Sequence, residues 1–136
     1  MAAISDSQES QFCGGTLIAS QWILTAAHCM FKDSAGTQPQ TAEEIRVVLG
    51  EHDLVDASES KITKKVVEVS RIIKHPSYNA ETSNNDIALL KLSQEVDLNV
   101  YTPSCVANTG DTFEGQKAWV YGKKVFIIQK TKKFMF

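Results

Sequence analysis

The sequence has no apolar run approaching the roughly 18 residues needed to span a bilayer, and its 136 residues suit a single domain. Residues 1–10 have neither a basic start nor a long apolar segment, so we expect no secretory signal there. The formal net charge of -2 gives no sign of the basic excess that binds nucleic acid or anionic membranes. We therefore expect no nucleic-acid partner and no membrane partner; no cofactor is expected either.

The small net charge conceals an uneven distribution. Five of the 14 Lys and Arg residues lie in residues 123–136, which contain no Asp or Glu. All 16 acidic residues lie in residues 1–122. This shift predicts an acidic folded part over residues 1–122, followed by a basic and apolar tail.

Cysteine is scarce and odd in number. The three cysteines are Cys13, Cys29 and Cys105. At least one thiol must therefore be unpaired or bonded outside this chain.

Helical periodicity is also scarce, since no helix-period segment is longer than about ten residues. Short stretches rich in apolar and β-branched residues, separated by turn residues, take its place. They cover residues 1–5, 12–19, 22–25, 45–49, 66–73, 86–92 and 117–122. This pattern predicts an all-β barrel or sandwich, with a hairpin around residues 6–10.

Two segments carry the chemistry. Residues 11–29 read QFCGGTLIASQWILTAAHC, and residues 71–92 read RIIKHPSYNAETSNNDIALLKL. A single histidine before a cysteine is more often packed or hydrogen-bonded than catalytic. Both segments together, with LGEHDL at 49–54 and FEGQKAWVYG at 113–122, resemble the trypsin-like serine proteases of the chymotrypsin fold.

The resemblance implies a six-stranded antiparallel Greek-key barrel, the N-terminal barrel of that fold, within a family region over residues 1–122. That region would also hold the inter-barrel linker and the first strand of the second barrel, and residues 123–136 would be a tail outside the family. His28 matches the general base, on a short helical turn after a strand, and Asp86 matches its orienting carboxylate. The resemblance also pairs Cys13 with Cys29 and leaves Cys105 as a free thiol.

The family's nucleophile lies in a G-D-S-G-G run, and none of the seven glycines belongs to such a run. We therefore expect a fragment of a secreted serine endopeptidase that lacks the serine and the oxyanion hole. Such a chain would be inactive alone and would need a missing C-terminal half to act on polypeptide substrates. An unpaired strand at residues 118–121 and a disordered or aggregating tail would follow. The alternative is a non-catalytic homologue that acts as a binding or regulatory module.

Metal binding is not expected. The spacing of Cys13, His28 and Cys29 matches no zinc pattern. The acidic residues of the 51–61 loop resemble the calcium loop of some trypsins, but a solvated loop is the preferred interpretation; they are Glu51, Asp53, Asp56 and Glu59. His52 and His75 also lie in loop-like contexts and are expected to be solvated.

Overall fold

The computed structural model describes residues 1–50, 63–112, 118–120 and 126–128; the last two segments are described as strands only. The chain divides into two compact units, Met1–Cys105 and Val106–Phe136, and each is described by itself. Within the described residues, no helix is long and apolar enough to cross a membrane.

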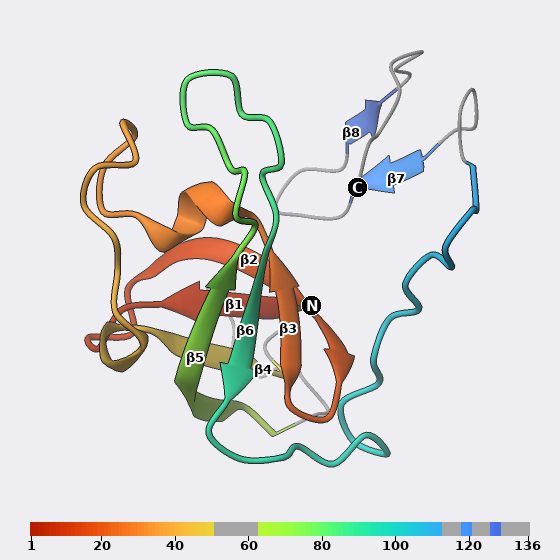
Figure 1. Cartoon of the computed structure of the whole chain (residues 1–136). Coiled ribbons are helices and arrows are strands. Elements are labelled where there is room, and N and C mark those ends of the chain that lie inside the picture. The colour runs from red at the N-terminus through yellow and green to blue at the C-terminus, as the bar shows by residue number, and fades with distance from the viewer. Residues whose placement is uncertain (51–62, 113–117, 121–125, 129–136) are drawn as a thin grey trace. The chain divides into compact units, whose positions relative to one another are not determined.

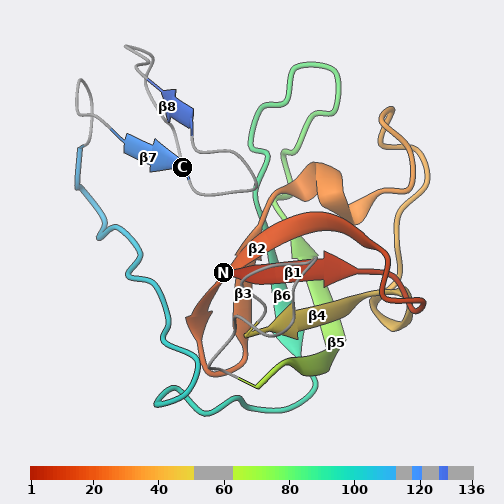
Figure 2. The same ribbon diagram turned by 180° about the vertical axis from the view of Figure 1, so that it is seen from behind.

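The first unit is a closed barrel of six antiparallel strands in the order β1-β2-β3-β6-β5-β4 (Figures 1 and 2). Its strands are β1 (Ala2–Ser5), β2 (Gln11–Ala19), β3 (Trp22–Thr25), β4 (Arg46–Leu49), β5 (Lys65–Lys74) and β6 (Ala88–Leu92). Two short 3₁₀ helices, η1 (Ala27–Met30) and η2 (Ala42–Glu44), follow β3 and precede β4. The prediction of a six-stranded antiparallel barrel is confirmed.

The barrel core follows the two-residue period of the strands. Alternate residues of β6, Ala88, Leu90 and Leu92, are at most 2% exposed, while Leu89 and Lys91 between them are only half-buried. The same alternation places Val67 and Val69 of β5 inside the barrel, whereas the three consecutive residues 47–49 of β4 are all buried. Burying a large aliphatic side chain contributes about 1.5–3 kcal/mol, so this pattern determines which face of each strand turns inward.

The expected hairpin around residues 6–10 is present between β1 and β2. Asp6 organises its turn, because its Oδ1 atom accepts hydrogen bonds from the backbone N–H groups of Gln8 and Ser10, each at 2.9 Å. Glu9 adopts a left-handed backbone with φ 61°. The local polar side chain therefore satisfies the turn backbone that no strand partner reaches.

Gly15 allows β2 and β3 to approach each other closely. A Cβ atom at this position would lie 2.7 Å from Ile23 Cγ2 and 3.2 Å from the Leu24 carbonyl oxygen. At the neighbouring Gly14 the nearest atom would be 3.9 Å away, which is ordinary contact. The barrel wall thus tolerates a side chain at one of these glycines only.

We expect Gly15→Ala to lower the free energy of unfolding by about 1–3 kcal/mol, because the added methyl group overpacks a filled core. Gly14→Ala is the matched control and should change stability much less. Urea unfolding of the two variants, followed by tryptophan fluorescence, measures the difference. Equal stabilities would contradict the close approach at Gly15.

The second unit contains a two-stranded antiparallel sheet of β7 (Ala118–Val120) and β8 (Phe126–Ile128). The expectation of an unpaired strand at residues 118–121 is therefore wrong, because residues of the tail supply a partner. The prediction that the tail would be disordered is also wrong for residues 126–128. The apolar, β-branched residues of this segment suit a strand, and pairing satisfies backbone groups that would otherwise be exposed.

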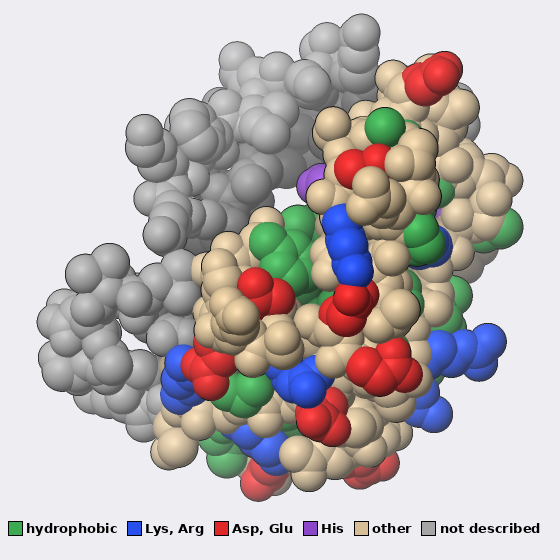
Figure 3. All heavy atoms as spheres, turned by 90° about the vertical axis from the view of Figure 1, so that its left-hand side faces the viewer, with side chains coloured by type: hydrophobic (Ala, Val, Ile, Leu, Met, Phe, Trp, Pro, Cys, Tyr) green, Lys and Arg blue, Asp and Glu red, His purple; other side chains and the backbone are tan. Residues whose placement is uncertain are grey.

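Acidic and basic side chains are intermingled on the barrel face shown in Figure 3. Ion pairs of the described residues include Arg46 with Glu68 at 3.3 Å and Lys64 with Glu9 at 2.9 Å.

The acidic loop with Glu51, Asp53, Asp56 and Glu59 lies outside the described residues, and so does His52.

Candidate active site

His28 is presented by the short 3₁₀ helix η1, directly after β3. Ala27 and Met30 of this turn are fully buried and anchor it to the barrel core. The His28 side chain is 62% exposed. Two apolar anchors on either side thus hold a polar residue at the surface, and the expected helical turn after a strand is present.

Asp86 lies two residues before β6, and β6 pairs with β3. The register of this pair places Ala88 opposite Thr25, so the start of β6 lies beside the end of β3. Asn85, with φ 56°, turns the chain just before Asp86, and its Nδ2 donates to the Ser77 carbonyl oxygen at 2.9 Å. Antiparallel pairing therefore brings together two residues that are 58 positions apart.

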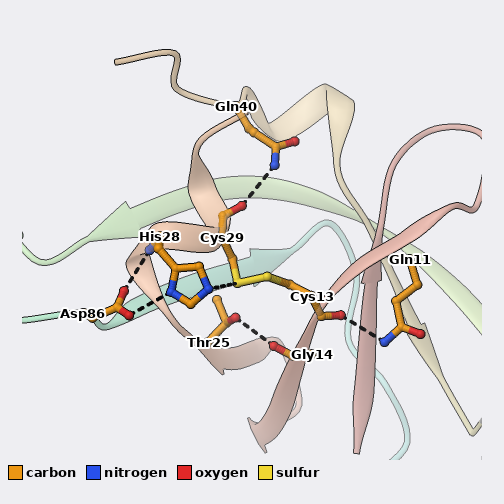
Figure 4. Close-up of a disulfide and its surroundings, with 8 residues drawn as sticks. All are labelled: Gln11, Cys13, Gly14, Thr25, His28, Cys29, Gln40 and Asp86. Carbon is orange, nitrogen blue, oxygen red and sulfur yellow. Dashed lines mark hydrogen bonds and ion pairs between the residues drawn. A yellow bond between two sulfur atoms is a disulfide. The ribbon is translucent and has the colours of Figure 1, made fainter. Parts of the chain in front are cut away.

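Both carboxylate oxygens of Asp86 contact His28 (Figure 4). The His28 backbone N–H donates to Oδ1 at 2.8 Å, and the ring Nδ1 lies 2.8 Å from Oδ2. An ionised carboxylate can only accept hydrogen bonds, so Nδ1 carries the proton and Nε2 of the neutral ring presents a lone pair. This arrangement can accept a proton at Nε2 and stabilise the resulting imidazolium.

A disulfide joins Cys13 of β2 to Cys29 of η1, across a sequence separation of 16 (Figure 4). It ties the turn that carries His28 to the barrel wall. The sulfur of Cys29 also lies 3.5 Å from His28 Nε2. The histidine ring is therefore placed between a carboxylate on one side and a disulfide on the other.

Two polar contacts around this turn were not foreseen from the sequence. Gln40 Nε2 donates to the Cys29 carbonyl oxygen at 3.0 Å, and Thr25 Oγ1 donates to the Gly14 carbonyl oxygen at 2.9 Å. Each contact spans 11 positions along the chain. They satisfy backbone groups beside the disulfide and so support the position of η1.

Tyr78 is a further neighbour that the sequence did not indicate. Its ring stacks on Phe31 with the ring centroids 5.7 Å apart. Burial raises the pKa of the Tyr78 phenol, and the negative charge of Asp86 raises this pKa further. Tyr78 therefore stays neutral near neutral pH, and its ring packs against the barrel core and Phe31.

The other cysteine and histidine residues singled out in the sequence either lie away from the His28–Asp86 pair or already have a bonding partner. Cys105 is exposed and forms no disulfide with another described cysteine. His75 accepts a hydrogen bond at Nδ1 from the Ser77 backbone N–H at 3.1 Å, in the loop before Asp86. The ligand atoms of Cys13, His28 and Cys29 lie within 4.8 Å of one another, but the two sulfurs are bonded to each other.

Comparison with known proteins agrees with this geometry. The family model described as Trypsin matches residues 1–124. Trypsin I-P1 of Gallus gallus is 42% identical over 113 residues, and cationic trypsin-3 of Rattus norvegicus is 41% identical over 115. Each alignment covers 82% of this chain and 39% of the relative. Vitamin K-dependent protein C of Rattus norvegicus is 36% identical over 110 residues, which are 80% of this chain and 21% of that protein.

The chain thus spans about two fifths of the length of the curated trypsins that it matches. The family match covers nearly the whole chain and includes the turn with His28, the disulfide and the segment with Asp86. The chain belongs to the trypsin family of S1-type serine proteases.

Proposed function

We propose that His28 and Asp86 are the general base and the orienting carboxylate of a serine endopeptidase. The observation that carries this proposal is the double contact of Asp86, which holds both the backbone and the ring of His28 at 2.8 Å. The two contacts together restrict ring rotation and select the tautomer with a lone pair on Nε2. That tautomer is the one a serine hydroxyl can donate to.

The proton steps follow from this tautomer. Nε2 takes the proton of a serine hydroxyl as the serine oxygen attacks the scissile carbonyl carbon of a polypeptide. The imidazolium that forms keeps its Nδ1–H bond to Asp86, whose negative charge stabilises it. Nε2 then returns the proton to the leaving amine.

We assign the serine and the oxyanion hole to polypeptide outside residues 1–136. The family's G-D-S-G-G run has no counterpart among the seven glycines of the sequence. On this proposal, residues 1–122 supply the barrel and the proton-transfer pair, and residues 123–136 take no part in catalysis. A structural disulfide between Cys13 and Cys29 is best kept in an oxidising environment, which favours an extracellular site of action.

A chimera tests the proposal. Residues 1–122 replace the matched region of Gallus gallus trypsin I-P1, and the segments of that relative on both sides are kept. We expect the chimera to hydrolyse a peptide ester, because its parent supplies the missing groups, whereas the 136-residue chain alone gives no hydrolysis above the buffer rate. Initial rates with a chromogenic ester measure both.

The intact relative is the positive control, and circular dichroism establishes that the chimera is folded. A folded chimera without activity would contradict the role of His28 and Asp86. Hydrolysis by the 136-residue chain alone would contradict the assignment of the nucleophile to another segment. The two outcomes separate the two halves of the proposal.

A further inference from the structure

The lone pair of His28 Nε2 faces sulfur atoms. Nε2 lies 3.5 Å from Cys29 Sγ, and the sulfur of Cys13 completes a set of three ligand atoms within 4.8 Å of one another. Thiolate sulfur and imidazole nitrogen are the ligands that Zn²⁺ prefers. In the oxidised chain the two sulfurs form a neutral disulfide, which lacks the thiolate charge that binds Zn²⁺.

The separation of nitrogen and sulfur fits a tetrahedral zinc site. Zn–S bonds of about 2.3 Å and Zn–N bonds of about 2.0–2.1 Å at tetrahedral angles place these two ligand atoms about 3.6 Å apart. The observed distance between His28 Nε2 and Cys29 Sγ is 3.5 Å. The two sulfurs must separate to about 3.8 Å, which side-chain rotation can supply at their Cα separation of 6.1 Å.

The carboxylate of Asp86, on the other side of the His28 ring, is the kind of hydrogen-bond partner that histidine ligands of zinc have. Histidine ligands of zinc commonly donate their second ring N–H to a carboxylate, which sets the tautomer and makes the bonding nitrogen more basic. Asp86 already holds Nδ1 of His28 in this way, at 2.8 Å. The imidazole is thus oriented for coordination through Nε2 before any metal arrives.

We propose that the reduced form of this chain binds Zn²⁺ through Cys13 Sγ, Cys29 Sγ and His28 Nε2. A dithiol reductant supplies two electrons and two protons, so the S–S bond breaks, two thiols form and the reductant becomes a disulfide. Zn²⁺ then displaces both thiol protons to solvent and binds two thiolates and the neutral imidazole. The exposed side of His28 leaves the fourth position for water.

This site gives the disulfide a consequence beyond stability. Zinc binding uses the lone pair of Nε2, which is the pair that a general base needs, so the zinc-loaded form is unable to take a proton from serine. This consequence rests on the proposed function. The zinc site itself does not, because its existence depends on the reduced chain and on metal affinity alone.

Cobalt titration of the full 136-residue chain tests the site. The Cys105→Ser background removes the unrelated thiol, and a phosphine reductant opens the disulfide. We expect one Co²⁺ per chain with the visible bands of tetrahedral coordination and thiolate charge transfer, and Zn²⁺ should displace it. The oxidised chain should give neither signal.

Asp86→Asn separates a folded site from chelation by an unfolded chain. It should weaken Zn²⁺ binding about 10–100-fold, because it removes the carboxylate that supports the histidine ligand. His28→Ala should weaken binding at least as much. Glu81→Gln, at an exposed position, and His75→Ala are the matched controls and should leave the affinity unchanged.

Failure of the reduced chain to show a tetrahedral thiolate spectrum would overturn the proposal. Equal zinc affinity of the parent and Asp86→Asn would also overturn it, because an unfolded chain binds metal through nearby Cys and His without a residue 58 positions away. An active chimera together with no zinc binding would leave the proposed proteolytic role intact. Zinc binding together with an inactive chimera would support the zinc site and contradict the proposed proteolytic role.

Discussion

Asp86→Asn in the trypsin chimera should lower kcat for ester hydrolysis about 10⁴-fold, a magnitude taken from this family's own triad rather than derived from this chain. The amide that replaces the carboxylate can turn its N–H₂ group toward Nδ1 of His28, where the Asp86 oxygen now accepts a hydrogen bond at 2.8 Å. Nδ1 would then accept, and the proton would move to Nε2. A protonated Nε2 is unable to remove the serine proton.

The separate effects on kcat and KM identify the cause of the lost activity. KM should change little, because Asp86 acts through His28 and not on the bound substrate. His28→Ala should reduce kcat by a comparable factor, and the double variant should be no worse than the more severe single one. Glu81→Gln is the matched carboxylate control. A loss in the Asp86→Asn chimera of less than tenfold, with the fold intact, would rule out the orienting role.

Removing both half-cystines as Cys13→Ala/Cys29→Ala should lower the free energy of unfolding of the full chain by about 3 kcal/mol. A cross-link over about 16 residues restricts the unfolded chain, and the chain-entropy model assigns a loop of this length about that value. Cys29 is also 5% exposed, so its replacement by alanine removes a packed sulfur from the core. Urea unfolding under oxidising conditions measures the change.

The free thiol provides the control. Cys105→Ala removes a cysteine that is exposed and outside the disulfide, so it should change stability by less than about 0.5 kcal/mol. Adding reductant to the parent chain should reproduce most of the loss seen in the double variant. A change in the double variant as small as that of Cys105→Ala would show that the loop closed by Cys13 and Cys29 is ordered without its cross-link.

The barrel strands were predictable because their signals are local. The apolar run Trp22–Thr25 is the observed β3, and the strand expected over residues 86–92 contains the observed β6. A period of two with one buried face determines which side chains turn inward whatever the strand's partners are. The turn at residues 6–10 was equally predictable, because the Asp6 carboxylate accepts hydrogen bonds from the backbone of its own turn.

The candidate site was less predictable from the residues themselves. The juxtaposition of His28 and Asp86 was expected from a family resemblance, and no spacing rule connects residues 58 positions apart. The structure brings them into contact through the pairing of β3 with β6. Their catalytic roles stay predictions that the chimera tests.

Some expectations about the tail were wrong for a different reason. Composition correctly marked residues 123–136 as basic and apolar, but it carries no information on what a segment pairs with. The partner of β7 is β8, which lies within that tail. Only residues 121–125 separate the two strands, so the pairing is local, and the apolar residues Phe126–Ile128 within the basic tail are its signal in the sequence.

Residue patterns along the chain were enough to identify the barrel strands, the odd thiol and the family, because these depend on short runs of apolar and β-branched residues, on residue counts and on motifs. The folded arrangement was needed to establish that Nε2 of His28 faces the sulfur of Cys29, that Tyr78 lies within the field of Asp86, and that β8 pairs with β7. Hydrogen bonds, electrostatic fields and ligand geometry all fall off over a few ångströms. Closing the barrel sets the distance between His28 and Asp86, which are 58 positions apart. The contact of His28 with Cys29 and the pairing of β7 with β8 depend instead on the local conformation of the chain.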